Sequence, residues 1–133
     1  MDKPMPEPTP VTQPFWDALK EHRVRIQYSP SAGQYVFYPR VLAPRTLADD
    51  LEWRDVSGDA TLYTFTVTDR ATAPPWQDSV PQLMAVVELD EGPRVTTEMV
   101  GVDPASLQVG MRVKPVFEDH PDDGVTLLKY TTA

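Results

Sequence analysis

The sequence contains no cysteine among its 133 residues. This absence excludes disulfide bonds, thiol nucleophiles and thiolate metal ligands. Histidine is scarce as well, because only His22 and His120 are present. They lie at the predicted end of a helix and in an acidic turn, so we expect them to be far apart in the fold. A metal site or an acid–base pair needs converging side chains, and two separated surface histidines provide neither.

Long apolar runs are also missing. No segment approaches the roughly 20 apolar residues that a membrane-spanning helix requires. The first ten residues, MDKPMPEPTP, lack the apolar core of a signal peptide. We therefore expect a cytoplasmic protein.

Basic residues are few, with 12 Lys and Arg against 20 Asp and Glu, and the formal net charge is −8. Most affinity for nucleic acid comes from neutralising phosphates with basic side chains. An acidic chain opposes this attraction, so DNA and RNA are disfavoured as partners.

Catalytic motifs are absent from the sequence. The acidic groups at residues 49–55 and 119–123 have neither the spacing of a calcium loop nor the paired carboxylates of a glycosidase. No serine lies in a Gly-x-Ser-x-Gly elbow. We expect no catalytic residue in this chain.

The N-terminal part is predicted to form an arm and an appendage to one compact domain. Residues 1–11 contain four prolines and should form an extended arm. Residues 12–50 begin with a short helix that Thr12 can cap and that ends near Arg23. A hairpin follows, with the turn formers of residues 29–33 at its tip.

The C-terminal part, residues 51–133, is predicted to be mainly β. Residues 61–68 alternate apolar and polar side chains, which indicates a half-buried strand. A single helical turn is expected at residues 105–108. Five β segments with one helical insertion favour a five-stranded OB-fold barrel. These five segments are residues 61–68, 82–89, 94–100, 112–118 and 125–130.

Several short motifs occur in an order and spacing that resemble one known family. They are residues 13–19 (QPFWDAL), 25–28 (RIQY), 38–40 (YPR), 51–53 (LEW), 56–58 (VSG), 86–94 (VVELDEGPR) and 107–113 (LQVGMRV). The family is the acyl-CoA-associated one often called domain of unknown function 35. Its members carry an N-terminal helix and a rubredoxin-like zinc ribbon before an OB-fold.

One departure from the family concerns zinc. Members usually place two Cys-x-x-Cys pairs in the ribbon, and the matching positions here are Ser29, Ala32, Ala43 and Thr46. None of these is a competent zinc ligand. We therefore expect no bound zinc, and a degenerate ribbon held by packing and cross-strand pairs. The candidates for this replacement core are Tyr28, Tyr35, Phe37, Tyr38 and Leu42.

The resemblance implies a non-catalytic accessory subunit that associates with a thiolase-like enzyme, in lipid or steroid metabolism. Such a subunit helps to bind or orient an acyl-CoA substrate within a hetero-oligomer and holds no tightly bound cofactor. Two alternatives remain. The chain is a stand-alone acyl-CoA-binding protein or small acyl-CoA enzyme, or it is an OB-fold binder of nucleic acid, which the acidic charge disfavours.

Five residues are candidates for ligand or partner contact. Phe15 and Trp16 are adjacent in the predicted helix, so one can anchor the helix while the other meets a partner, or both are buried. Trp76 lies in a proline-rich loop, where large side chains often anchor interfaces, or it folds back over the barrel. Arg40 and Arg70 are suited to CoA phosphates or partner carboxylates, with structural ion pairs as the alternative.

Overall fold

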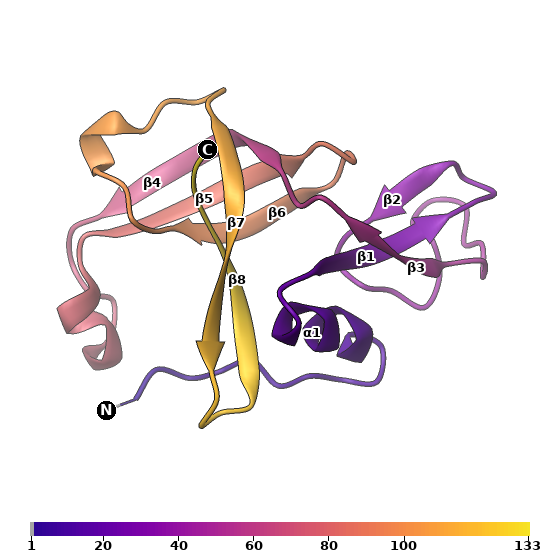
Figure 1. Ribbon diagram of the computed structural model, residues 1–133, viewed down its shortest axis with the longest axis horizontal. Helices are drawn as coiled ribbons and strands as arrows, with labels where there is room; N and C mark the ends of the chain where they lie inside the picture. Colours follow the sequence, from indigo (N-terminus) through magenta and orange to yellow (C-terminus); the bar gives the residue numbers. More distant parts are fainter. Residues whose placement is uncertain (1) are drawn as a thin grey trace.

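The computed structural model describes residues 2–133, so Met1 of the predicted arm at residues 1–11 lies outside the described residues. The remainder of the arm forms no helix or strand and runs beneath the barrel (Figure 1). Near its start, Lys3 Nζ donates a hydrogen bond to Ser79 Oγ at 2.6 Å. The arm therefore contacts a loop far away in the sequence.

Helix α1 spans Gln13–Lys20 and ends before the predicted end at Arg23. Thr12 occupies the N-cap position, but its hydroxyl accepts a hydrogen bond from the Thr9 backbone N–H at 2.9 Å instead of capping the helix. The helix buries one face against the rest of the protein, and the residues of this face are Phe15, Ala18 and Leu19. Within residues 2–133, no helix has the length and apolar character that crossing a membrane demands.

The ribbon is a three-stranded antiparallel sheet of β1 (Val24–Ser29), β2 (Gln34–Val36) and β3 (Glu52–Val56), in the order β2-β1-β3. We predicted residues 51–56 as the start of the barrel region, but β3 pairs with β1 along its whole length. A charge pair supports this register, because Arg25 lies opposite Asp55 and its Nε donates to Asp55 Oδ1 at 2.7 Å. The barrel strands therefore begin at Ala60.

Five strands close into a barrel in the order β4-β5-β6-β8-β7 (Figure 1). The 3-10 turn η2 (Pro104–Ser106) follows the third barrel strand, and η1 (Pro74–Ser79) lies in the predicted proline-rich loop. This order is the Greek-key arrangement of an OB-fold, so the predicted fold class is confirmed. The barrel strands are β4 (Ala60–Thr68), β5 (Gln82–Leu89), β6 (Arg94–Met99), β7 (Arg112–His120) and β8 (Val125–Thr132).

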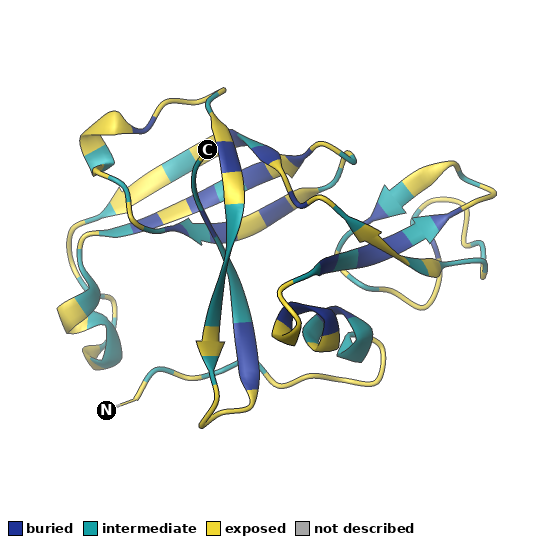
Figure 2. Ribbon diagram, in the orientation of Figure 1, coloured by how far each residue is buried: buried dark blue, intermediate teal, exposed yellow. Residues whose placement is uncertain are grey.

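Alternate residues of the barrel strands are buried (Figure 2), and they form one core that continues into the ribbon. Tyr130 is fully buried in this core, and its hydroxyl donates to the Gly58 carbonyl oxygen at 2.6 Å. Burial raises the pKa of this hydroxyl well above its usual value. Gly58 has a φ of 76°, and a Cβ there would lie 2.8 Å from Val24 Cγ2. This glycine therefore lets the ribbon approach the barrel closely.

Candidate functional site

A cavity of about 330 Å³ lies between α1, the segment after β2 and the outer wall of the barrel. Its lining is predominantly apolar, which is typical of small-molecule sites. Three separate parts of the chain build it. Helix α1 contributes Phe15, Trp16 and Leu19, and its N-cap residue Thr12 lies beside them. The segment after β2 contributes Phe37, Tyr38 and Pro39.

Aromatic rings form one side of this cavity. Phe15 is only 7% exposed, and its ring centroid lies 5.2 Å from that of Trp16 and 5.5 Å from that of Phe37. Phe37 in turn contacts Tyr38, with centroids 4.4 Å apart. Both Phe15 and Trp16 line the same cavity, with Phe15 buried and Trp16 partly exposed. Helix α1 thus supplies an aromatic wall.

The barrel side of the cavity lies over a weak seam. Strands β6 and β8 run parallel and pair only at Met99 and Tyr130. Beyond that point the Thr97 hydroxyl bridges the strands by donating to the Leu128 carbonyl at 2.9 Å. Residues 95–98 of β6 and 127–129 of β8 line the cavity on either side of this seam.

Charged groups at the barrel wall are paired with one another. Lys129 Nζ lies 2.9 Å from Glu118 Oε2 and 3.4 Å from Glu98 Oε2. Burial raises the pKa of Glu118, but hydrogen bonds from Lys129 and His120 outweigh it and hold that pKa below its usual value. Only Glu98 and Lys129 of this group line the cavity. The cavity can hold an apolar group, but its lining offers no activated nucleophile.

The other predicted contact residues lie outside the cavity lining. Arg40 has an exposed side chain, and the buried Gln27 amide holds its backbone through two hydrogen bonds of 2.7 Å. Arg70 is exposed in the loop after β4. Trp76 is partly buried within η1. The structure therefore brings together only Phe15 and Trp16 of the five candidates.

The barrel residues of the cavity were not among our predictions, although the sequence contains a signal for them. Leu127 and Leu128 are adjacent in β8, and adjacent strand residues point to opposite faces. One leucine must therefore be covered from outside the barrel. Met84 and Val86 likewise place apolar side chains on the outward face of β5, and Met84 lines the cavity. Helix α1 packs against β8 and β7, whereas Met84 remains exposed at the edge of the cavity.

The two histidines are closer in space than we predicted. His22 Nε2 lies 2.9 Å from Asp119 Oδ2, next to His120 in the sequence, and the His22 ring stacks on Phe117. The predicted separation is wrong because α1 ends against β7. The rings still do not converge on one site. His120 contacts Glu118 at 2.7 Å on the face of β7 opposite to Asp119.

The ribbon positions that match the family's cysteines do not fit a zinc ion. Ala32 and Ala43 have no donor atom, and the buried Ser29 hydroxyl donates to Asp50 Oδ1 at 2.8 Å. Asp50 Oδ2 also accepts from the Ser31 backbone N–H at 2.8 Å. Hydrogen bonds from Ser31 and then from Ser29 hold the pKa of Asp50 below its usual value. No group of three or more metal-ligating side chains occurs within residues 2–133.

The aromatic replacement core is only partly as predicted. Tyr28 and Tyr35 form a cross-strand pair with ring centroids 4.8 Å apart, and Phe37 packs against Phe15. Tyr38 and Leu42, however, are 57% and 41% exposed. They lie in the segment between β2 and β3, which turns their side chains outward. Hydrogen bonds to Asp50 hold the tip of the ribbon instead.

Comparison with known protein families adds to this geometry. The family model described as "ChsH2, C-terminal OB-fold domain" matches residues 53–118. A DUF35 domain-containing scaffold protein of Methanothermobacter thermautotrophicus is 34% identical over 91 residues, covering 67% of this chain and 68% of that protein.

A longer relative is the 3-oxo-4,17-pregnadiene-20-carboxyl-CoA hydratase alpha subunit of Mycobacterium tuberculosis. It is 33% identical over 109 residues, which cover 81% of this chain. The match spans only 34% of the length of that relative.

Among solved structures, the Ltp2-ChsH2(DUF35) aldolase contains a similar chain with a TM-score of 0.83 and 24% sequence identity. The alignment covers 96% of this chain and 98% of that chain. A likeness at this level of identity supports the whole arrangement of helix, ribbon and barrel.

Proposed function

Because this chain belongs to the DUF35 family, we propose that it is a non-catalytic accessory subunit that associates with a thiolase-like enzyme. In this proposal the chain helps to bind or orient the acyl part of an acyl-CoA substrate, and the larger partner supplies the catalytic groups. A place in lipid or steroid metabolism and a cytoplasmic location belong to the same proposal.

The observation that carries the proposal is the apolar cavity between α1 and the β6–β8 seam. Its volume of about 330 Å³ lies at the lower end of the range found for small-molecule sites. Aromatic side chains and the leucines of β8 favour an apolar ligand over a polar one. An acyl chain satisfies this requirement, whereas the polar part of CoA does not.

The charges around the cavity support a binding role over a catalytic one. Lys129 is already paired with Glu98 and Glu118, and no histidine lines the cavity. General acid–base catalysis needs a side chain within hydrogen-bond reach of the reacting atom. The partner enzyme must therefore provide the reacting groups.

Names of relatives are consistent with such an assembly. One relative is named as the alpha subunit of a CoA-ester hydratase, and one similar structure is an aldolase of two named components. Others carry the name of scaffold proteins. These three kinds of name agree with a hetero-oligomer in which this chain associates with a larger acyl-CoA enzyme.

A pull-down from native cell extract with the tagged chain as bait tests the association. We expect mass spectrometry to find a thiolase-family enzyme in near-equal amount. Turnover of acyl-CoA by the isolated chain, with no retained partner, would instead support a small acyl-CoA enzyme.

Ligand binding can be tested by filling the cavity from the barrel side. Thr96 is exposed on β6 and lines the cavity, so Thr96→Phe should occupy space needed by an acyl chain. We expect the affinity for octanoyl-CoA, measured by calorimetry on the purified complex, to fall by about tenfold or more.

A matched control comes from β4, on the other side of β5. Thr64 is exposed on β4 and, like Thr96, pairs with Val86, but it does not line the cavity. Thr64→Phe should leave the affinity unchanged. Equal losses in both variants, or equal binding of octanoyl-CoA and free CoA, would contradict an acyl-binding cavity.

A stand-alone acyl-CoA-binding protein is the second candidate. The cavity favours this second function in one respect, because residues of this chain alone form the walls of the cavity. Tight binding of octanoyl-CoA by the isolated chain, together with no retained partner in the pull-down, would select this function.

A further inference from the structure

The segment between β2 and β3 presents an unusual group of exposed apolar side chains. Val41 is 71% exposed and Leu47 is 70% exposed. Tyr38 and Leu42 are exposed as well. We call these four residues, together with the exposed Arg40 and Arg45, the second-knuckle patch.

Exposed apolar side chains are concentrated in this segment, which is unusual because contact with water disfavours them. Nine large apolar residues are exposed within residues 2–133, and four of them lie in this one segment. Isolated exposed apolar residues are ordinary, but a cluster on one short segment indicates an interaction surface. Covering Val41 and Leu47 would remove apolar area from water, which is the main favourable term in association.

Backbone hydrogen bonds and a side-chain amide hold this segment in place. The Ala43 N–H donates to the Ala48 carbonyl at 2.9 Å, and the Leu47 N–H donates to the Ala43 carbonyl at 3.0 Å. Ala43 is fully buried, and the Gln27 amide holds the backbone of Arg40. A rigid surface loses little conformational entropy when a partner binds.

Two backbone conformations in this segment are strained. Arg45 and Leu47 have φ values of 70° and 58°, in the left-handed region that disfavours residues with a branched or bulky side chain. Such conformations persist only where the surrounding structure enforces them, and they cluster at functional sites. One of these two residues, Leu47, also has a highly exposed apolar side chain.

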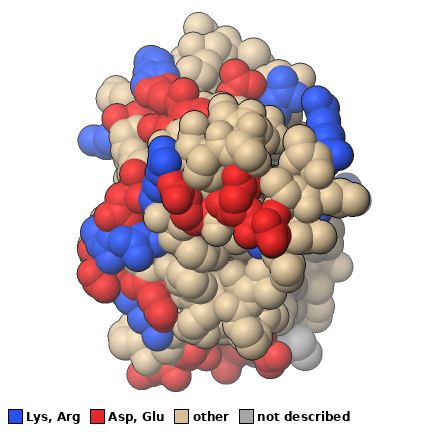
Figure 3. Space-filling model, turned by 90° about the vertical axis from the view of Figure 1, so that its right-hand side faces the viewer, with Lys and Arg blue, Asp and Glu red and all other residues tan. Residues whose placement is uncertain are grey.

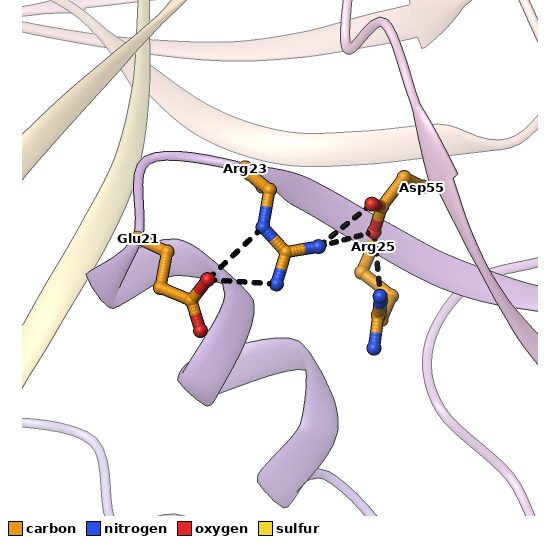
Figure 4. Close-up of polar contacts among 4 residues, drawn as sticks. All are labelled: Glu21, Arg23, Arg25 and Asp55. Atoms are coloured by element: carbon orange, nitrogen blue, oxygen red, sulfur yellow. Dashed lines mark hydrogen bonds and ion pairs between the residues drawn. The ribbon is translucent and has the colours of Figure 1, made fainter.

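Charge identifies the chemistry of the partner. Residues 22–48 contain no Asp or Glu, although the whole chain has a net charge of −8. Arg23 and Arg25 in this range are neutralised, because both bind Asp55 and Arg23 also binds Glu21 (Figure 4).

Arg40 and Arg45 differ from these two arginines, because neither forms an ion pair with any residue in the described range 2–133. The space-filling view onto the ribbon end shows acidic and basic side chains interleaved on the left, with broad uncharged surface between the charged groups (Figure 3). Two unpaired guanidinium groups beside apolar side chains complement a surface with carboxylates around an apolar hollow.

We propose that the second-knuckle patch is the surface through which this chain docks on its larger partner enzyme, which presents an apolar hollow bordered by Asp or Glu side chains. The proposal rests on the proposed function for the existence of that enzyme. It adds which face of this chain makes the contact, and that face adjoins the acyl-binding cavity at Tyr38, which belongs to both.

The test uses substitutions that leave the fold intact. Leu47→Asn removes the apolar side chain and replaces it with a residue that tolerates the left-handed conformation. Val41→Asp places a negative charge at the other highly exposed apolar position, which is 71% exposed. Val109→Asp is the matched control, since Val109 is 66% exposed in the loop before β7.

Each tagged variant is used as bait in the same extract, and its affinity for the purified retained enzyme is then measured by biolayer interferometry. We expect Leu47→Asn and Val41→Asp each to weaken binding by about tenfold or more, while Val109→Asp changes it by less than about twofold. The melting temperature of Leu47→Asn should be equal to or above that of the wild type. Unfolding then cannot explain the loss.

The arginines give a second readout. Replacing both Arg40 and Arg45 with Gln should slow association several-fold at low salt, and the wild-type rate should fall with added salt more steeply than that of the double variant. A salt dependence identical in the two proteins would contradict the role assigned to these arginines.

The outcomes distinguish this proposal from the proposed function. If a thiolase-family enzyme binds the wild type and all variants equally, the docking surface is wrong and the proposed function stands. If the patch variants lose a carboxylate-rich partner that is not a thiolase-type enzyme, the surface stands and the proposed partner is wrong. If the wild type retains nothing, both proposals fail. If only self-association depends on the patch, the docking surface is wrong.

Discussion

The Tyr130 hydroxyl joins the two halves of the molecule. It lies in the barrel core and donates to the carbonyl of Gly58, in the turn between ribbon and barrel. A Tyr130→Phe variant keeps the ring but leaves a buried carbonyl without its partner. We expect the free energy of unfolding to fall by about 1–3 kcal/mol, as measured by urea denaturation.

Tyr63→Phe is the appropriate control for this variant. Tyr63 is exposed on β4, and its ring keeps the stacked Arg94 guanidinium after the substitution. Its unfolding free energy should change by no more than about 0.5 kcal/mol. Similar losses in both variants would show that the Tyr130 hydrogen bond contributes nothing specific.

The same hydroxyl predicts how stability depends on pH. Burial raises the pKa of Tyr130, so above about pH 10 the unfolded chain releases this proton while the folded chain retains it. The stability from this group is fully present below pH 10 and is lost as the pH rises further. The unfolding free energy of the wild type should therefore fall more steeply above pH 10 than that of Tyr130→Phe.

At the scale of elements, Asp50 stabilises the tip of the ribbon, where a zinc ion binds in most members of the family that this sequence resembles. Its carboxylate binds Ser29 and Ser31 at the tip of the β1–β2 hairpin. Asp50→Ala should lower the melting temperature, whereas Asp49→Ala should not, because Asp49 is exposed and makes no side-chain hydrogen bond within residues 2–133. Calorimetric scans of the two variants at pH 7 check this difference.

Two further results should accompany the Asp50 variant. The pKa of Asp50 is below its usual value, so its contribution is present above that value and is lost as the pH falls through the folded-state pKa. The difference between the variant and the wild type should therefore shrink in acid. We also expect no stoichiometric zinc in the purified protein and no effect of a chelator; one tightly bound zinc per chain would contradict this account.

How far the sequence predicts each element depends on whether its signal is local. The alternation of residues 61–68 is local, and it correctly predicts a strand there. It does not predict the buried face, because the register shifts between Leu62 and Thr64 and leaves Tyr63 and Val67 exposed. Strand β3 has no such local pattern. Only its pairing with β1 shows that it belongs to the ribbon. The left-handed conformations of Arg45 and Leu47 are also invisible in the sequence, since no glycine marks them.

The candidate site illustrates the same limit. Phe15 and Trp16 were predictable because they stand together on a short helix. The cavity also needs β6 and β8, which are separated by residues 100–124 and meet only when the barrel closes. Arg70 and Trp76 have the right chemistry for contact, but the fold places them outside the lining.

At the scale of the whole molecule, the charge decides between OB-fold functions. Many OB-folds bind single-stranded nucleic acid through a basic groove with stacking aromatics. A net charge of −8 opposes this binding. A labelled 20-nucleotide single strand should show no gel shift with the protein even in 20 mM salt, whereas tight and salt-sensitive binding would overturn the acyl-CoA interpretation.

The single-pair closure between β6 and β8 has a mechanical consequence. Long ladders hold β4 to β5 and β7 to β8, so a force on the barrel wall is not shared equally around the ring. The wall yields first where β6 leaves β8, because few backbone hydrogen bonds resist opening there. This compliant edge is the floor of the cavity. If the cavity binds an acyl chain as proposed, we expect a bulkier ligand to enlarge it by spreading these two strands, while the remainder of the barrel keeps its shape.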